Sequence, residues 1–510
     1  MASGTELKIA PGDTPKTESK PVSVSNPLAS LAAAKFASQH WRRLLALSAL
    51  VLAPCFWHRH IIASDLGSHL YNAWITQLIH RGQVPGLWLS HQWTNVLFDW
   101  MLSGFGSLFG LFAAEKIAVS LCVLVFFWGA FALVGAASGR APWLLTPLIG
   151  IFAYGWSFHI GLYNYYLSIG LSFFCLAIFW RGKPWERIAI LPAAVLIAIA
   201  HPFGVLWLAG ACIFIGAMLY VPPKYHALTL LVSAVAIWSI RHYMNHHFVT
   251  EFEPDQWYMF SGLDQVILFG LRYRIIKWAL LLFALAALAI DVIRRRRERP
   301  FRRDYLVPVQ LYVVVELAVF LFPRGVTFPD RVPIALITER LTSISAIVLC
   351  CVLGVMRPSR WHLAASLAIA GIFAAFVYED TAVANRIELQ AERLVHTVPP
   401  GTRVIASILP LEDSRIMIQH TIDLACIGYC FSYGNYEPGS EVFRVRGTPG
   451  NPYVIPDYGT VADIEKGNYV VQPQDLPVYQ VYQCTKTGVD LCIRPLAAGE
   501  QNNRLGAYRP

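Results

Sequence analysis

Long apolar runs dominate this chain and leave few folds open to it. The hydrophobic fraction is 56% and the charged fraction only 14%. Between residues 42 and 378 the apolar residues gather in runs of roughly 16–22 residues, about the length that a helix needs to cross a bilayer. Lipid offers no hydrogen-bond partners to an exposed backbone, so such runs favour transmembrane helices. The sequence therefore predicts an all-α polytopic membrane bundle followed by a small α/β domain.

Eleven of these runs are predicted to cross the membrane. The expected spans are 42–57, 115–136, 143–159, 162–180, 187–201, 203–221, 226–243, 275–293, 305–322, 335–356 and 361–378. With the N-terminus inside, the basic loops at Arg181 and Arg294 both fall on the inner side, as the positive-inside rule requires. The net charge of +9 therefore reflects topology and argues against a nucleic-acid partner. An odd number of spans places everything after Tyr378 outside.

Composition divides the chain further. Residues 1–40 are polar and rich in Pro, Ser, Lys and Ala, which predicts a disordered cytoplasmic tail before the transmembrane domain at 41–378. That domain contains a long first outer loop at 58–114. Residues 94–112 of this loop are apolar enough to span, but a span there would move Arg181 outside. We therefore expect an interfacial or re-entrant helix at this position.

Residues 379–510 differ from the rest of the chain, because short β-prone runs alternate with turn-rich stretches. We expect a small extracytoplasmic α/β domain here. Four of the chain's cysteines lie in it, at Cys426, Cys430, Cys484 and Cys492. A disulfide such as Cys484–Cys492 and a zinc site are both open, although only one Cys-x-x-x-Cys and no Cys-x-x-Cys occurs. The sequence indicates no metal ligands and leaves the need for a cofactor or divalent metal open.

The first outer loop begins with Ser64-Asp65-Leu66-Gly67-Ser68-His69. Asp65 and His69 are four residues apart, so a helix places them on one face. A carboxylate whose partial burial raises its pKa suits a general base that takes a proton from a hydroxyl group. We therefore predict that Asp65 and His69 are catalytic. A helix N-cap for Asp65 and a structural role for His69 are the alternatives.

Five arginines are expected on the outer side, where the positive-inside rule does not favour them. They are Arg272, Arg274, Arg324, Arg331 and Arg340. Guanidinium groups hold phosphate through paired hydrogen bonds, so these arginines are predicted to bind an anionic group of a substrate. Lipid headgroups or nearby carboxylates are the alternative partners.

Three polar residues in outer turns complete the predicted substrate-binding set. His159 and Asn164 belong to a turn rich in tyrosine, whose side chains suit sugar hydroxyls. His201 precedes Pro202, which divides two apolar runs. An interfacial aromatic belt at the first turn and a plain hairpin at the second are the competing interpretations.

The order of these parts resembles the GT-C superfamily, integral membrane glycosyltransferases that use polyprenyl-phosphate or polyprenyl-pyrophosphate sugars. One helix is followed by an outer loop that opens with Asp65, then by a many-helix bundle and an outer C-terminal domain. The runs 158–171, 200–202 and 398–405 are similar to runs in uncharacterised bacterial members. The resemblance implies a bacterial inner (plasma) membrane, juxtamembrane helices in the first loop, Asp65 as the catalytic acid and Arg340 at the donor phosphate. The first loop lacks the Asp-Asp, Asp-Glu or Glu-x-Asp pair of many metal-dependent members.

We therefore predict a glycosyltransferase that moves a hexosyl or pentosyl group from a lipid-linked donor to an acceptor on the extracytoplasmic face. Asp65 would be the general base. The acceptor, whether glycan, lipid or protein, stays open, and membrane lipids are the other expected partners. A non-catalytic membrane assembly or binding protein, acting through its outer C-terminal domain, is the alternative. The apolar runs lack rows of acids or histidines, which argues against a pump.

Overall fold

The computed structural model describes residues 29–298, 303–328, 331–356, 358–408, 411, 413–440, 442–485 and 489–503. The chain forms two compact units, Met1–Leu44 and Leu45–Pro510. Helix α1 (Ala29–Leu52) begins in the first unit and ends in the second, and every later element belongs to the second unit. Most of the predicted disordered tail lies outside the described residues, and residues 29–40 belong to α1.

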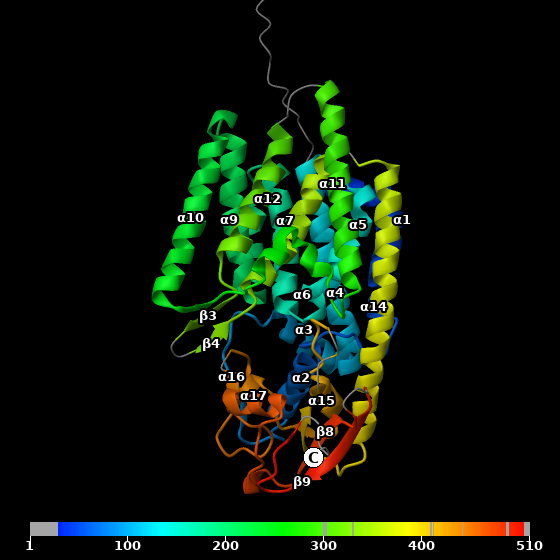
Figure 1. Ribbon diagram of the computed structural model, residues 1–510, viewed down its shortest axis with the longest axis vertical. Helices are drawn as coiled ribbons and strands as arrows, with labels where there is room; N and C mark the ends of the chain where they lie inside the picture. Colours follow the sequence, from blue (N-terminus) through cyan, green and yellow to red (C-terminus); the bar gives the residue numbers. More distant parts are fainter. Residues whose placement is uncertain are drawn as a thin grey trace, which may run out of the picture. The chain divides into compact units, whose positions relative to one another are not determined.

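Seven helices of the described chain are long and apolar enough to cross a membrane. They are α4 (Leu111–Ser138), α7 (Tyr163–Arg181), α9 (Pro202–Tyr220), α10 (His226–His247), α11 (Tyr273–Glu298), α13 (Ile337–Val355) and α14 (Arg360–Val395). Contacts join them into one bundle, in which α9, α10 and a further helix, α12 (Arg303–Leu321), can be followed side by side (Figure 1). Each of the seven coincides with a predicted span, so the membrane character read from the apolar runs is supported at these positions.

The other four predicted spans do not meet the same length and hydropathy criteria in the described chain, so eleven spans are not confirmed. Residues 42–57 cover the end of α1. Residues 143–159 are broken into α5 (Thr146–Ala153) and α6 (Trp156–His159), because Gly155 has an extended backbone. Residues 187–201 yield only α8 (Ile190–Ala200), and 305–322 correspond to α12 (Arg303–Leu321), which contains Pro308.

The first loop, residues 58–110, folds into two helices that are not among the seven. Helix α2 (Leu66–His80) follows Asp65, and α3 (Leu97–Phe109) ends at Gly110, whose φ of +81° separates it from α4. Helix α3 packs on α2, α4, α7 and α8. Within 94–112, residues 97–109 therefore form a helix of 13 residues packed on the bundle, too short to span, and residues 111–112 begin α4.

The remaining elements are short. The helices are α15 (Thr421–Cys426), α16 (Glu437–Ser440) and α17 (Tyr458–Lys466), with 3-10 turns at Ala53–Cys55, Trp143–Leu145, Glu186–Ala189, Pro223–Tyr225, Gln256–Val266 and Pro473–Asp475. The strands are β1 (Leu87–Leu89), β2 (Val249–Glu251), β3 (Gly325–Phe328), β4 (Arg331–Ile334), β5 (Arg403–Ser407), β6 (Phe431–Ser432), β7 (Val445–Gly447), β8 (Val478–Gln483) and β9 (Leu491–Leu496).

The C-terminal region, residues 379–503, is built on a four-stranded sheet of order β6-β5-β8-β9. Strand β5 is parallel to β6 and β8, while β9 is antiparallel to β8. A small core of aliphatic residues, including Ile405, Val461 and Ile464, joins the sheet to α17. Disulfides Cys426–Cys430 and Cys484–Cys492 use all four cysteines of the region, so the disulfide interpretation holds over the zinc one.

The C-terminal region is not a separate compact unit. Strand β7 pairs with β1 of the first loop, α15 packs against α2, and α14 runs from the bundle directly into the region. The first loop and the C-terminal region therefore fold against each other, which brings residues more than 300 positions apart into contact.

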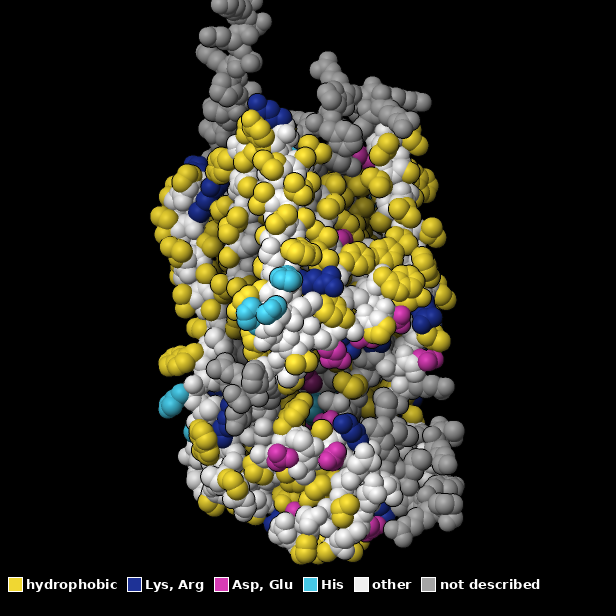
Figure 2. Space-filling model, turned by 60° about the vertical axis from the view of Figure 1, so that its left-hand side comes forward, with side chains coloured by type: hydrophobic (Ala, Val, Ile, Leu, Met, Phe, Trp, Pro, Cys, Tyr) yellow, Lys and Arg dark blue, Asp and Glu magenta, His cyan; other side chains and the backbone are white. Residues whose placement is uncertain are grey.

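Exposed apolar side chains cover the helical part of the molecule. On α9, Leu206 and Ile213 are more than 70% exposed, and Leu231 and Trp238 on α10 are more than half exposed. In the view of Figure 2, hydrophobic side chains dominate the helical part. Water-soluble proteins rarely expose so large an apolar surface, and lipid would cover it.

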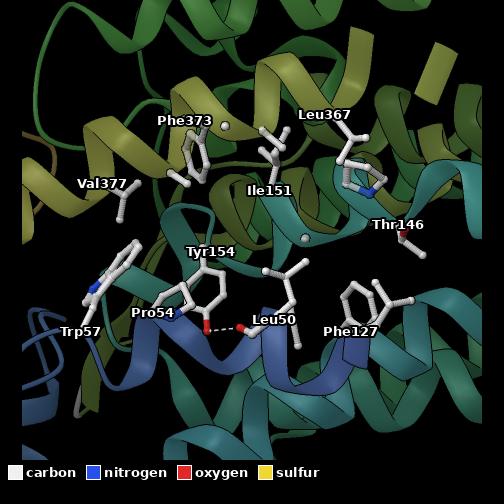
Figure 3. Close-up of a pocket in the computed structure, with 17 residues that line it drawn as sticks. Leu50, Pro54, Trp57, Phe127, Thr146, Ile151, Tyr154, Leu367, Phe373 and Val377 are labelled. Atoms are coloured by element: carbon white, nitrogen blue, oxygen red, sulfur yellow. Dashed lines mark hydrogen bonds between the residues drawn. The ribbon is translucent and has the colours of Figure 1, made fainter. Parts of the chain in front are cut away.

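An apolar cavity of about 330 Å³ lies where α5 and α14 meet the last turns of α1 (Figure 3). The Tyr154 hydroxyl donates a hydrogen bond to the carbonyl of Val51 beside it. No charged side chain lines this cavity among the described residues.

The close crossing of α4 and α7 depends on glycine. An alanine Cβ at Gly129 of α4 would lie 2.3 Å from the carbonyl oxygen of Gly170 on α7, and a Cβ at Gly170 would lie 2.9 Å from the backbone of Phe126. At this crossing the ring of Phe126 stacks on Tyr166 at 4.3 Å. The backbones of α4 and α7 can approach this closely only because neither glycine has a side chain.

We expect Gly129→Ala to destabilise the bundle by roughly 1–3 kcal/mol, the usual cost of overpacking. Thermal unfolding followed by a thiol-reactive dye on buried cysteines such as Cys122 would measure the shift. Gly150→Ala on α5 is the matched control, because a Cβ there meets nothing within 4 Å. Equal melting temperatures for Gly129→Ala and the wild type would contradict the close crossing.

Candidate functional site

A cavity of about 510 Å³ lies where the first loop, the bundle and the C-terminal region meet. Its polar wall includes the side chains of Asp65, His201, Arg340 and His420. A second acid, Glu465, and the hydroxyl of Thr94 also line it. The rest of the wall is apolar, aromatic or amide-bearing. The apolar residues include Leu162, Pro202, Phe203, Leu206, Ile334 and Leu336, and the aromatic or amide-bearing residues include Gln92, Gln419, Tyr436, Phe443 and Tyr458.

Asp65 occupies the position before the first turn of α2, and its side chain makes no capping hydrogen bond to the described backbone. The carboxyl group is 26% exposed and faces the cavity. The N-cap interpretation is therefore wrong, because a capping carboxylate would accept a hydrogen bond from the helix start. The carboxyl group is left to face the cavity and the cations around it.

The backbone at Asp65 is held from both sides. The Asp65 amide donates to the carbonyl of Ile160, and the Ser64 amide donates to that of His159. Gly161, at φ +87°, lies so close that a Cβ there would be 2.7 Å from the Asp65 nitrogen. The turn at 159–161 thus fixes the position of the acid.

His159 has a structural place in this turn. Its ring is buried, and its Nδ1 lies 2.9 Å from the carbonyl oxygen of Ile62. It does not line the cavity. Its predicted substrate-binding role has no support from this position, because the ring is buried and does not reach the cavity.

His69 lies one helical turn after Asp65 and is buried. Its Nδ1 is 2.7 Å from Oδ1 of Asp99 on α3. Burial alone would lower the pKa of His69, but the negative charge and hydrogen bond of Asp99 raise it to about 9. His69 is therefore charged at neutral pH and ties α2 to α3, although it does not itself line the cavity.

Asn164, near the start of α7, fixes the other side of Asp99. Its Nδ2 donates to Oδ2 of Asp99 at 3.0 Å and to the carbonyl of Asn95 at 3.1 Å. Its Oδ1 accepts from the amide of Phe98. All three contacts position α3, so the geometry gives Asn164 a supporting place rather than contact with a substrate.

His420 comes from the C-terminal region and was not expected from the sequence. Its Nε2 lies 3.7 Å from Oδ1 of Asp65, and its Nδ1 lies 2.9 Å from Oδ2 of Asp423. Burial would lower the pKa of His420, while Asp423 and Asp65 raise it to about 9. Asp65 thus has a charged imidazole on the cavity side and a second one, His69, a turn away.

The pKa of Asp65 is set by opposing effects. Burial raises the pKa of the carboxyl group above its usual value, while the positive charges of His420, His69 and Arg340 act to lower it. Burial is the larger effect, so the pKa of Asp65 lies above that of an exposed carboxyl group, a shift that suits a general base.

Arg340, in the first turn of α13, has the guanidinium group that is best placed to bind a ligand in the cavity. Its Nη1 donates to the carbonyl of Ala335 at 3.0 Å, and its guanidinium lies 5.7 Å from the ring of Tyr165. Its Nε is buried and has no hydrogen-bond partner among the described residues. No carboxylate pairs with Arg340 among those residues, so this guanidinium keeps donors for an anion in the cavity.

His201 lines the same cavity at the start of α9. Its Nδ1 accepts from the amide of Phe203 at 3.1 Å and caps the helix. Burial and the charge of Arg340 lower the pKa of this ring well below its usual value, so it is neutral. The hairpin interpretation is correct, and the ring also faces the cavity.

The other predicted arginines lie elsewhere. Arg272 pairs with Glu379 at 2.8 Å and with Asp380 at 2.7 Å. Arg324 pairs with Glu253 at 2.6 Å and with Glu339 at 2.8 Å. Arg274 is exposed on α11. Neighbouring carboxylates, the alternative partners considered from the sequence, satisfy Arg272 and Arg324, and neither residue nor Arg274 lines the cavity. The side chain of Arg331 lies outside the described residues.

Sequence reasoning missed the contribution of the C-terminal region. Neither His420 nor Asp423 belongs to a recognisable motif, and each stands more than 350 residues from Asp65. One weak signal was Gly67, where a Cβ would be 2.5 Å from the carbonyl oxygen of His420. A glycine two residues after the acid marks a close backbone approach, but it does not say which segment approaches.

Asp99→Asn should weaken the pH dependence of stability. The pKa of His69 is about 9 in the folded chain and near 6.5 when unfolded, so its pairing stabilises the fold fully below about pH 6.5 and is lost as pH rises through 9. We expect the wild-type melting temperature to fall between pH 6.5 and 9, and to fall less in Asp99→Asn.

Asp490→Asn is the control, because this carboxyl group is exposed. His60, near Glu115 and Glu392, also has a pKa of about 9, so part of the wild-type slope remains in every variant. An unchanged slope in Asp99→Asn would show that His69 is not charged in the fold.

No metal site accompanies this arrangement among the described residues, where no group of three or more His, Cys, Asp or Glu side chains could hold an ion. No protein-family model, curated protein or solved structure matches the chain.

Proposed function

We propose that the chain is an integral membrane glycosyltransferase that transfers a sugar from a polyprenyl-phosphate-type donor to an acceptor on the extracytoplasmic face. One observation carries the proposal: a single cavity holds a carboxylate, a guanidinium without a carboxylate partner among the described residues, and an apolar wall that continues onto a lipid-facing helix. A lipid-linked donor needs all three features within one site.

The apolar wall suits the tail of the donor. Phe203 and Leu206 belong to α9, and Leu206 is 72% exposed on the apolar face of that helix. A tail confined to the bilayer could enter along this face while its phosphate stays in the cavity. Anchoring tail and phosphate orients the sugar before any bond changes.

Arg340 suits the donor phosphate. The leaving phosphate gains negative charge as the glycosidic bond breaks, and a fixed guanidinium stabilises that charge. His201 beside it is neutral and can donate from Nε2, because its Nδ1 accepts from the backbone.

Asp65 suits the acceptor hydroxyl. Its carboxylate takes the hydroxyl proton as the acceptor oxygen forms a bond to the anomeric carbon. The bond from that carbon to the phosphate oxygen breaks, and its electron pair leaves with the phosphate. A single displacement of this kind inverts the configuration of the anomeric carbon.

The aromatic part of the wall suits a polar acceptor. Tyr436, Phe443 and Tyr458 offer ring faces, and Gln92 and Gln419 offer amides that can bond to hydroxyl groups. Figure 1 shows α16 and α17, which flank this part of the wall, beneath the bundle.

The proposal includes the membrane topology of the chain. Eleven spans would place the N-terminus in the cytoplasm and the C-terminal region outside, in the inner membrane of a bacterium. The two disulfides of the C-terminal region favour an oxidising compartment.

Asp65→Asn should lower sugar transfer by about 10²–10⁴-fold, because the variant loses its general base while its side chain keeps the same size. Transfer from radiolabelled polyprenyl-phosphate hexose and pentose to an extract of envelope glycan would be measured in membrane vesicles. Asp463→Asn, at an exposed position of α17, should retain wild-type activity. Full turnover in Asp65→Asn would remove the mechanism.

Native mass spectrometry tests the donor site directly. We expect a polyprenyl phosphate to co-purify with the wild-type chain and to be lost from Arg340→Gln, because the phosphate then lacks its cation. Arg272→Gln is the matched control, since Arg272 lies outside the cavity. A stoichiometric protein partner in place of the lipid would favour the non-catalytic assembly protein.

A further inference from the structure

We propose that the C-terminal region completes the site by supplying His420 as a positioning residue, whose imidazolium, oriented by Asp423, holds Asp65 ionised in the cavity. The role of Asp65 as a base rests on the proposed function. The charge relation between His420 and Asp65 is a separate claim, and it can be tested without any substrate.

The geometry of the three side chains carries the proposal. Asp423 accepts two hydrogen bonds, from Nδ1 of His420 at 2.9 Å and from the hydroxyl of Ser432. These bonds fix the ring plane of His420 and leave Nε2 directed at Asp65, 3.7 Å from Oδ1. A buried carboxylate behind an imidazole is a common way to fix both its orientation and its charge.

The surroundings of His420 leave little freedom for the ring. Its carbonyl packs against Gly67, where a Cβ would lie 2.5 Å from the carbonyl oxygen, and its ring lies 5.0 Å from that of Tyr436. The amide of Met417 donates to the hydroxyl of Ser64, so the segment before His420 is bonded to the residue before Asp65. The Cys426–Cys430 disulfide joins the last residue of α15 to the chain four residues later.

The groups that face Asp65 come from each element packed around it. His420 belongs to the C-terminal region, His69 to α2 and Arg340 to α13, and all three are cations that favour its ionised form. Tyr436 and Tyr458 of the C-terminal region also interact with Asp65 across the cavity. His420 itself faces the acids Asp423, Asp65 and Glu465. Its Nε2 also lies 3.0 Å from Nε2 of Gln419, whose amide can turn its oxygen toward a protonated ring.

His420 is the cation closest to the carboxyl group, and it is the only one of the three cations that the C-terminal region contributes. An opposite charge at this range lowers the pKa of a carboxyl group by roughly 1–3 units. Removing the charge of His420 should therefore raise the pH at which Asp65 becomes protonated, without altering the cavity wall elsewhere.

The pH at which Asp65 is protonated can be measured chemically in the full chain reconstituted in lipid nanodiscs. Dicyclohexylcarbodiimide reacts with protonated carboxyl groups in apolar surroundings. Labelling would be followed across pH 4–9 by mass spectrometry of the peptide that contains Asp65. We expect the midpoint to rise by about one pH unit in His420→Asn and His420→Gln, which place a neutral amide near Nδ1 and Nε2 respectively.

Two further variants make the result specific. His420→Lys restores a positive charge and should return the midpoint toward the wild-type value. His201→Gln changes another ring of the same wall that is neutral and pairs with no carboxylate among the described residues, so its midpoint should equal that of the wild type.

An unchanged midpoint in either amide variant that elutes as a folded monodisperse protein, or an equal shift in His201→Gln, would overturn the proposal. A shifted midpoint with no polyprenyl phosphate bound would leave the charge relation standing and remove the proposed function instead. The two claims therefore fail by different measurements.

Discussion

Buried contacts between imidazole and carboxylate groups hold the two helices of the first loop together and join the loop to the bundle and to the C-terminal region. His60 contacts Glu115 of α4 and Glu392 of α14, His69 contacts Asp99 of α3, and His420 reaches across from the C-terminal region. A buried charge without a partner is strongly destabilising, so each pair requires its two segments to stay together. The position of Asp65, and with it the cavity, depends on these contacts more than on any one helix.

The parts of the site that are local in sequence could be predicted. The spacing of Asp65 and His69 follows from the period of a helix, and Arg340 and His201 stand near the ends of predicted spans. His420 and Asp423 could not be found in this way, because their proximity to Asp65 is a tertiary contact over more than 350 residues. The same limit applies to Arg272 and Arg324. Their carboxylate partners lie on other segments, so the pattern of spans does not show that either arginine is paired.

Hydropathy predicted the helical bundle but not the shape of every helix in it. Residues 143–159 are as apolar as their neighbours, yet Gly155 and the hydrogen bonds around Gln265 break them into two short helices. Such a break is tolerated at membrane depth when protein groups satisfy the freed backbone, and here Gln265 accepts from the amide of Ser157. A hydropathy window averages over the break, so it cannot distinguish an interrupted segment from a continuous span.

Helix α14 continues without interruption for 36 residues, from the bundle into the C-terminal region. At 1.5 Å per residue this is a rod of about 54 Å. A continuous helix resists bending at the boundary between the two regions. Helix α14 is therefore a rigid connection between the bundle and the sheet of the C-terminal region. The cavity wall itself uses shorter elements, among them β4, whose Pro333 and Ile334 line it just before Arg340.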